Sequence, residues 1–318
     1  MPFLSRLFSS RPVAGSYPDE PAEVGVALTG SRQEKRRLTA LVNRIARGSD
    51  FGRSLLEDAA RGGYTLGFAF SVGGSGVCLA DRKALTLNPI LSDVSLIKVL
   101  AHEARHAGQE GRTDPKDIER LNIRSEIMYF RAAEADAEAC AAAVCHEMAQ
   151  SGDRAPFEAL KANDEKLCRP FAEAEGSAVR PEIMTRAFDS WYENPYTKFM
   201  YAMHYHVEPM TEAMKTGNFD EQPFSVDMPP EKIIADVCAF RDGKTYFTET
   251  PSVLMDEKHL GVGQSHWERF EKYFALRSLR TGTAPDTSLA EVPVIGRNAP
   301  ARENIRAPVL RQSRGGGR

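Results

Sequence analysis

Apolar residues recur at helical spacing near the start of the chain. Four of them share one stripe of a predicted helix that begins after Ser31: Leu38, Leu41, Val42 and Ile45. Leu55 and Leu56 belong to a second predicted helix, and Gly62 and Gly63 end this helical region. The pattern therefore predicts a helical pair that backs the core.

The pattern then changes from helical spacing to alternation. Residues 64–71, 77–80 and 84–88 have the alternating apolar and polar positions of short strands, and the turn sequences GGSG and Asp-Arg-Lys separate them. This pattern predicts a small antiparallel sheet with one face toward solvent.

Start and stop signals place two more helices after the strands. Ser92 and Asp93 suit the N-cap of a helix that runs to about Gly111, and Pro115 suits the first turn of another that continues to Gln150. The order of helix, small sheet, helix and helix predicts an α+β fold.

Composition divides the chain into five predicted segments. Residues 1–30 are expected to be a flexible leader, residues 31–152 the core, and residues 153–215 a helical extension rich in aromatic residues. Residues 216–280 are a smaller mixed region that contains the strand-like sequence KTYFTET. Residues 281–318 are expected to be a disordered tail, whose arginines make it a candidate docking segment for an acidic partner.

Charge and cysteine content exclude several classes of protein. The 41 Lys and Arg residues against 44 Asp and Glu give a net charge of -3, so no global basic field favours nucleic acid as a partner. The five cysteines lack C-x-x-C spacing, which argues against a disulfide framework or a cysteine zinc site.

The sequence predicts neither a membrane span nor a signal peptide. No stretch approaches the roughly 18 apolar residues of a membrane span, and Arg6 interrupts the apolar residues at the N-terminus, so the core of a signal peptide is missing. We therefore expect a cytoplasmic protein, although secretion without a cleavable signal leaves no trace in a sequence.

The sequence HEARH, at residues 102–106, lies inside the helix predicted after Ser92. Residues four apart on a helix project from one face, so His102 and His106 can bind one divalent metal while Glu103 lies beside them as a base. With 7 histidines in 318 residues, chance produces this pattern in on the order of one such chain in a hundred. The alternative is a structural histidine pair on an exposed helix.

A catalytic zinc normally has three protein ligands, so one more is needed. In the next predicted helix, eight of the twelve residues 132–143 are alanine. Small side chains let two helices approach closely, which makes Glu134 the predicted third ligand. Glu138, one turn further, is expected to accept a hydrogen bond from a ligand histidine; alternatively, both glutamates face solvent. Three weaker ligand candidates are Asp136, Glu126 and His146.

HExxH followed 28 residues later by the glutamate of R-x-x-E-A-D-A resembles the gluzincin metallopeptidases, and especially compact bacterial metallopeptidase-like domains of unknown function. The resemblance covers residues 36–150. It implies a small antiparallel sheet packed on a backing helix, an active-site helix that carries HExxH, and a ligand-bearing helix with Glu134, followed by a mainly helical extension. It also implies that the strand at residues 84–88 is the cleft edge that binds the substrate backbone.

Two departures from related patterns refine this resemblance. Gln109 and Arg112 stand where a metzincin has Gly and His, which argues against that class. Glu138 stands where gluzincins commonly have Asp, so the residue behind the ligand histidines stays open.

Together these features predict a zinc-dependent peptidase with one zinc per chain and a peptide or protein as substrate. Zinc lowers the pKa of its bound water to about 7, and Glu103 takes the proton as that water attacks the carbonyl. Glu103 then passes the proton to the leaving amine. Four residues of the aromatic segment are candidate donors to the oxyanion: His204, His206, Tyr196 and Tyr201.

Two other functions stay open from the sequence. One is a regulatory or scaffold protein that keeps a structural metal, against which the intact Glu103 argues. The other is a metal-dependent hydrolase of a non-peptide amide, because the same site attacks any suitably held carbonyl. The ligand set also suits iron, cobalt or nickel.

Overall fold

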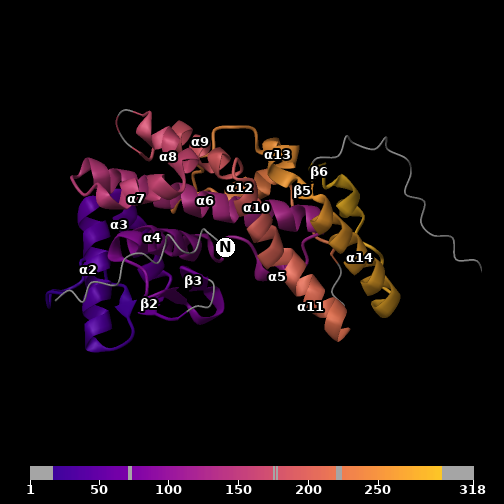
Figure 1. Cartoon of the computed structure of the whole chain (residues 1–318), viewed down its shortest axis with the longest axis horizontal. Helices are drawn as coiled ribbons and strands as arrows, with labels where there is room; N and C mark the ends of the chain where they lie inside the picture. Colours follow the sequence, from indigo (N-terminus) through magenta and orange to yellow (C-terminus); the bar gives the residue numbers. More distant parts are fainter. Residues whose placement is uncertain (1–16, 71–73, 175, 177, 220–223, 296–318) are drawn as a thin grey trace, which may run out of the picture.

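The computed structural model of the protein describes residues 17–70, 74–174, 176, 178–219 and 224–295. The long helix α6 (Ile123–Gln150) runs through the middle of the molecule. Figure 1 shows the sheet with helices α2 (Arg32–Gly48), α3 (Asp50–Arg61) and α4 (Asp93–Gln109) toward one end, and the C-terminal helices toward the other. The fold is mainly helical α+β, as the order of elements predicted.

Helices α2 and α3 form the backing layer that the periodicity predicted. Ser31 caps α2 in a capping box with Glu34, and Ser49 ends α2 and caps α3 through its side chain. The four apolar residues of the predicted stripe are all buried: Leu38, Leu41, Val42 and Ile45.

The sheet has four strands in the order β1-β2-β4-β3. Their bounds are Ala27–Leu28 for β1, Thr65–Phe68 for β2, Gly76–Leu79 for β3 and Ala84–Leu87 for β4. β1 and β2 run parallel, as do β2 and β4, and β3 alone pairs antiparallel with β4. The sheet is therefore mixed, and the prediction of a purely antiparallel sheet was wrong.

The order of the strands also corrects the expected cleft edge. β4, at Ala84–Leu87, is an inner strand because β2 pairs on one side and β3 on the other. The edge strand beside α4 is β3 instead, since an added Cβ at Gly76 would lie 2.5 Å from Val99 of α4. A hairpin through the 3-10 turn Ala80–Arg82 puts β3 outside β4.

The ends of the chain contribute to the fold more than their composition predicted. In the expected leader, Val24 and Val26 are buried and β1 joins the sheet. In the expected tail, Leu289 is buried within a 3-10 helix at Thr287–Glu291, and β6 (Val294–Ile295) pairs with β5 (Val262–Gly263). The disorder expected at 281–318 therefore does not hold for this part. Residues 1–16 and 296–318 lie outside the described residues.

The helix predicted from Pro115 to Gln150 is two helices. A short helix α5 (Pro115–Ile118) ends before Leu121, whose backbone forms a bridge with Val226. Asn122 then caps α6, because its side chain accepts from the amide of Ser125. Pairing with a distant segment thus breaks a helix that local signals favoured.

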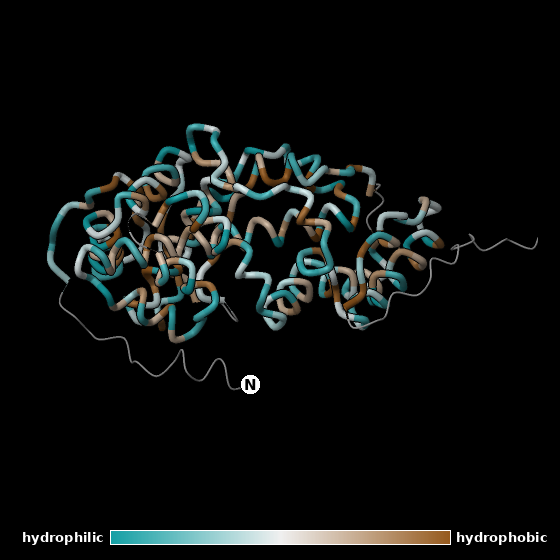
Figure 2. The backbone as a smooth tube through the Cα atoms, turned by 90° about the horizontal axis from the view of Figure 1, so that it is seen from above, coloured by the Kyte–Doolittle hydropathy of each residue, from teal (hydrophilic) through white to brown (hydrophobic). Residues whose placement is uncertain are grey.

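The rest of the described chain is mostly helical, and its elements are α7 (Ala155–Asn163), α8 (Glu165–Ala172), α9 (Pro181–Trp191), α10 (Pro195–Ala202), the π-helix η2 (Met203–Val207), α11 (Glu208–Thr216), α12 (Pro230–Val237), the 3-10 helix Pro251–Met255, α13 (Glu257–Leu260) and α14 (Gln264–Thr281). The KTYFTET sequence forms no strand; Thr245 makes a single bridge with Ala239. Figure 2 shows hydrophobic stretches along the inner helices and mostly hydrophilic turns outside. None of the described helices is long and apolar enough to cross a membrane.

Candidate metal centre

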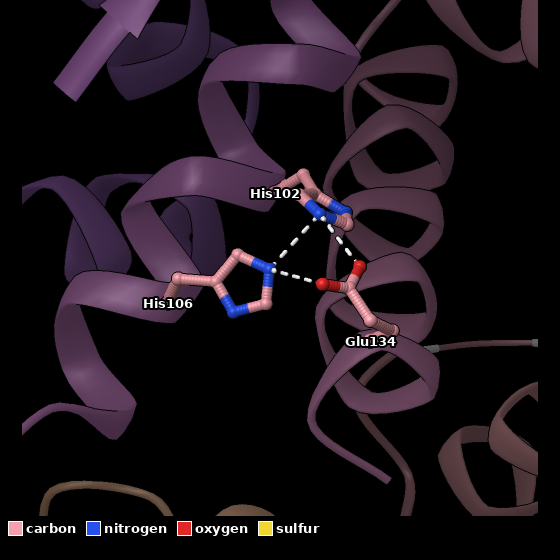
Figure 3. Close-up of side chains that lie close together, drawn as sticks. All are labelled: His102, His106 and Glu134. Carbon is pink, nitrogen blue, oxygen red and sulfur yellow. Dashed lines mark hydrogen bonds and ion pairs between the residues drawn. The ribbon is translucent and has the colours of Figure 1, made fainter. Parts of the chain in front are cut away.

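Helices α4 and α6 pack side by side, and the candidate site lies between them. Three alanines that lie about one turn apart along α6 are fully buried and let the two backbones approach: Ala132, Ala135 and Ala139. His102 and His106 lie one turn apart on α4 and face Glu134 of α6 (Figure 3). All three project into the same space, which is the arrangement that the helical spacing predicted.

The three side chains place their ligand atoms close together. The Nε2 atoms of His102 and His106 are 3.0 Å apart. Glu134 Oε2 lies 3.4 Å from Nε2 of His102, and Glu134 Oε1 lies 3.5 Å from Nε2 of His106. Ligand atoms at about 2.0–2.1 Å from a tetrahedral zinc lie about 3.3–3.4 Å from one another. The group could therefore hold a metal ion with little rearrangement.

One carboxylate oxygen of Glu134 lacks a hydrogen bond. Its side chain is buried, with 4% of the residue exposed, and its Oε2 atom accepts no hydrogen bond from the described residues. A buried carboxylate oxygen without a partner is costly. A cation between the imidazoles and this oxygen would satisfy it, so the donor set fits a metal.

Charge at the cluster is balanced between protons and carboxylates. Burial alone would lower the pKa of His102, but the carboxylates of Glu138 and Glu134 raise it to about 10. Burial would raise the pKa of Glu134, but His106 and His102 hold it well below its usual range. A metal that binds here therefore displaces protons from the imidazoles.

Glu138 lies behind His102 on the side away from the cluster. Its Oε1 atom is 3.3 Å from Nδ1 of His102, which is an ion-pair distance, but the contact lacks hydrogen-bond geometry and Nδ1 has no hydrogen-bond partner among the described residues. Glu138 also binds Lys98. Burial opposes ionisation of Glu138, yet Lys98 and His102 lower its pKa to about 2. Glu138 therefore acts on His102 through its charge.

Glu103 lies next to His102 on α4 and is 7% exposed. Its carboxylate points toward the edge strand, because a Cβ added at Gly76 of β3 would lie 3.0 Å from Glu103 Oε1. Only a residue without a side chain allows β3 to approach α4 so closely. The candidate base thus lies between the histidine helix and the sheet edge.

The sequence did not identify Tyr205, which touches the cluster directly. Its hydroxyl donates to Glu134 Oε1 at 2.7 Å, and its ring stacks on Phe130 with centroids 4.8 Å apart. Tyr205 comes from the π-helix η2, whose wider turn changes which residues face inward, and such turns are frequent at functional sites. The aromatic richness of this segment was the one signal, and it does not say which tyrosine faces the site.

The four residues that the sequence predicted as donors to the oxyanion lie in different places. Tyr201 is close enough to Glu134 for burial and that carboxylate to raise its pKa well above the usual range. His206 is buried, and its Nδ1 lies 3.1 Å from Glu126 Oε1. Tyr196 is 58% exposed, and His204 pairs with the neighbouring Glu208. The structure brings Tyr201 to the cluster but not these other three candidates.

The weaker ligand candidates also have other contacts. Glu126 is occupied by His206, and the ring of His146 packs on Phe157 and Phe171. Asp136 binds Arg105 from within the core. Among the described residues, the group that could hold a metal is the one that the sequence placed first.

The fold and this site define a mainly helical α+β protein with a His/His/Glu group that could hold a metal ion. The profile of the Putative metallopeptidase family (DUF6782) matches residues 21–248, and the chain belongs to this family. The match extends beyond residues 36–150, where the motifs lie, in both directions. No curated protein and no solved structure matches the chain.

Proposed function

We propose that this protein is a zinc-dependent peptidase. The observation that carries the proposal is the spacing of the nitrogen and oxygen atoms of the three side chains, at 3.0–3.5 Å, with one carboxylate oxygen that accepts no hydrogen bond from the described residues. His102, His106 and Glu134 would hold the metal. When bound, zinc would acidify a water and polarise the scissile carbonyl. Membership of a metallopeptidase family supports a peptide or protein as the substrate.

Glu103 is the proposed general base. Its carboxylate takes a proton from the attacking water and then gives it to the amine that leaves, so that one side chain serves both proton transfers. Its place next to His102 and against β3 puts the carboxylate at the junction of metal cluster and sheet edge.

Two further features of the chain suit peptide hydrolysis. The hydroxyl groups of Tyr205 and Tyr201 lie by Glu134 and can donate a hydrogen bond to a developing oxyanion. β3 is an edge strand, and an extended peptide can pair with the free backbone groups of such an edge. In this proposal the scissile carbonyl would lie between the sheet edge and the tyrosines.

The Glu103→Gln variant tests this proposal. It keeps the shape of the side chain but cannot take a proton, so we expect full metal content and a loss of peptidase activity of about 10²- to 10⁴-fold. Activity is measured on a mixture of quenched fluorescent peptides, and Glu110→Gln, an exposed glutamate at the end of the same helix, is the control.

Two outcomes would contradict the proposal. Undiminished cleavage by Glu103→Gln in a preparation whose cleavage a chelator stops would remove Glu103 as the base. Wild-type protein that carries its metal and cleaves no peptide in the mixture would favour a structural metal in a regulatory or scaffold protein.

A further inference from the structure

A glutamine amide links His106 to a buried aspartate. Gln109 Oε1 lies 2.8 Å from Nδ1 of His106, and Gln109 Nε2 donates to Asp136 Oδ2 at 2.6 Å. The same amide nitrogen donates to the carbonyl of Ala133 at 3.2 Å. Gln109 thus bridges the end of α4 to α6 behind the cluster of His102, His106 and Glu134.

The chemistry of these groups fixes the direction of every hydrogen bond. An ionised carboxylate only accepts, so the amide nitrogen of Gln109 must face Asp136 and the amide oxygen must face His106. Because that oxygen also only accepts, Nδ1 of His106 must carry the hydrogen. In the neutral imidazole, Nε2, which faces His102 and Glu134, then carries the lone pair that a metal would bind.

Asp136 has a second set of partners, which are all donors. It has no exposed surface, forms an ion pair with Arg105, and accepts from the hydroxyl of Tyr246 at 2.7 Å. Arg105 also donates to the carbonyls of Val237 at 2.6 Å and Ala239 at 2.9 Å. One partner of Asp136, Tyr246, thus lies 110 residues further along the chain.

We infer that Gln109 and Asp136 are positioning residues that fix the tautomer and ring orientation of His106, and that residues 237–246 belong to the metal site through them. The inference rests on the proposed metal-dependent function. The family match is consistent with it, because the matched region ends at residue 248, just after Tyr246.

The two ligand histidines therefore differ in what stands behind them. His102 has the carboxylate of Glu138 at Nδ1, whereas His106 has a neutral amide. A carboxylate at position 109 would face the carboxylate of Asp136 directly, which like-charge repulsion opposes. An amide is the side chain that can accept from the imidazole and donate to the aspartate at once.

The direct test is the tautomer of His106 in the zinc-loaded wild-type chain, measured by nitrogen-15 NMR of labelled histidine. We expect a protected hydrogen on Nδ1 and the metal shift on Nε2. A hydrogen on Nε2 would overturn the inference, and this measurement needs no variant to fold.

The Gln109→Met variant, of similar volume, tests the same inference by affinity. We expect its zinc affinity, measured by chelator competition, to fall about 10- to 100-fold, with loss of protection of the Nδ1 hydrogen and an altered visible spectrum of the cobalt-loaded chain. Gln150→Met is the matched control, because this exposed glutamine of α6 donates only to the carbonyl of Gly176, at 3.0 Å, and its zinc affinity should equal that of the wild type.

The proposed function and the positioning role of Gln109 can be refuted separately. Wild-type protein that binds no zinc would refute the proposed function itself. Wild-type protein that binds zinc, together with a folded Gln109→Met variant of equal affinity and an unchanged cobalt spectrum, would overturn the positioning role alone.

Discussion

At the scale of single residues, the site is built from carboxylates in different states of satisfaction. Both oxygens of Asp136 accept from donors, whereas Glu134 has one oxygen bound by Tyr205 and one that accepts no hydrogen bond from the described residues. Because both are buried on the same helix, the contrast is a property of their partners and not of their depth. Glu134 is therefore the carboxylate that can still bind a cation.

The Tyr205→Phe variant tests the bond to Glu134. Removing the hydroxyl takes away a hydrogen bond to the ligand carboxylate and a donor near the reacting carbonyl, so we expect kcat to fall by about 10-fold or more with little change in KM. Steady-state kinetics on a cleaved peptide measures it, with the exposed Tyr196→Phe as the control. Equal kcat values for the two variants would show that Tyr205 has no part in the reaction.

The sequence predicted some of these residues and not others for a physical reason. The histidines and Glu134 follow from helical spacing and from the small residues that let two helices meet, which are local properties. Tyr205 depends on a π-turn, and Gln109 depends on how an amide is oriented between two helices. Neither leaves a periodic signal in the sequence.

At the scale of elements, an ion pair helps to join the backing helix α2 to the end of α6. Arg44 of α2 donates twice to Asp153, just beyond the end of α6, at 2.6 Å and 2.9 Å. Gly152, with φ of 103°, makes the turn that brings Asp153 back. The pair therefore holds the backing helix against the helix that carries Glu134.

The Asp153→Asn variant should show a stability loss that depends on pH. The hydrogen bond from Arg44 lowers the pKa of Asp153, although burial opposes the shift. The carboxylate therefore contributes its stability above the unfolded pKa of about 4 and loses it as the pH falls through the lower folded value. We expect the variant to be about 1 kcal/mol less stable at pH 7.

Urea unfolding of both proteins over a range of pH measures this difference. The gap in free energy of unfolding should shrink as the pH falls below about 4, because Asp153 then takes up a proton in the unfolded chain before it does so in the folded protein. A gap of constant size from neutral to acidic pH would mean that the ion pair does not hold the helices together.

Elements were predicted from the sequence better than their pairing was. The strands β2, β3 and β4 and the helices α2, α3 and α4 follow local alternation and capping, and they appear close to where the sequence predicted them. The parallel pairing of β1, β2 and β4, and the break before Asn122, depend on contacts with distant segments. Local patterns cannot encode such contacts.

At the scale of the whole molecule, the predicted core of residues 31–152 depends on hydrogen bonds to later segments of the chain. Arg105 lies within it, almost fully buried, but donates to the carbonyls of Val237 and Ala239. Arg131 likewise donates to the carbonyls of His259 and Gly261. The C-terminal segments thus supply carbonyl partners to both buried cations, of which Arg105 also pairs with Asp136 inside the core.

A chain that ends at Gly152 tests whether the core can stand alone. Without the later segments, Arg105 and Arg131 lose the carbonyls that satisfy them, so we expect no cooperative thermal transition and no zinc binding. Circular dichroism and chelator competition measure both, with residues 17–295 as the control. A cooperative transition together with zinc binding by the short chain would show that the later segments are an independent addition.

The metal content of the chain tests the central claim most directly. Elemental mass spectrometry would be made on wild-type protein, on His106→Ala and on the exposed-histidine control His204→Ala, all purified without a histidine tag and supplied with zinc. We expect about one zinc per chain in the wild type and in His204→Ala, and little in His106→Ala. No zinc in the wild type, or equal zinc in all three proteins, would contradict it.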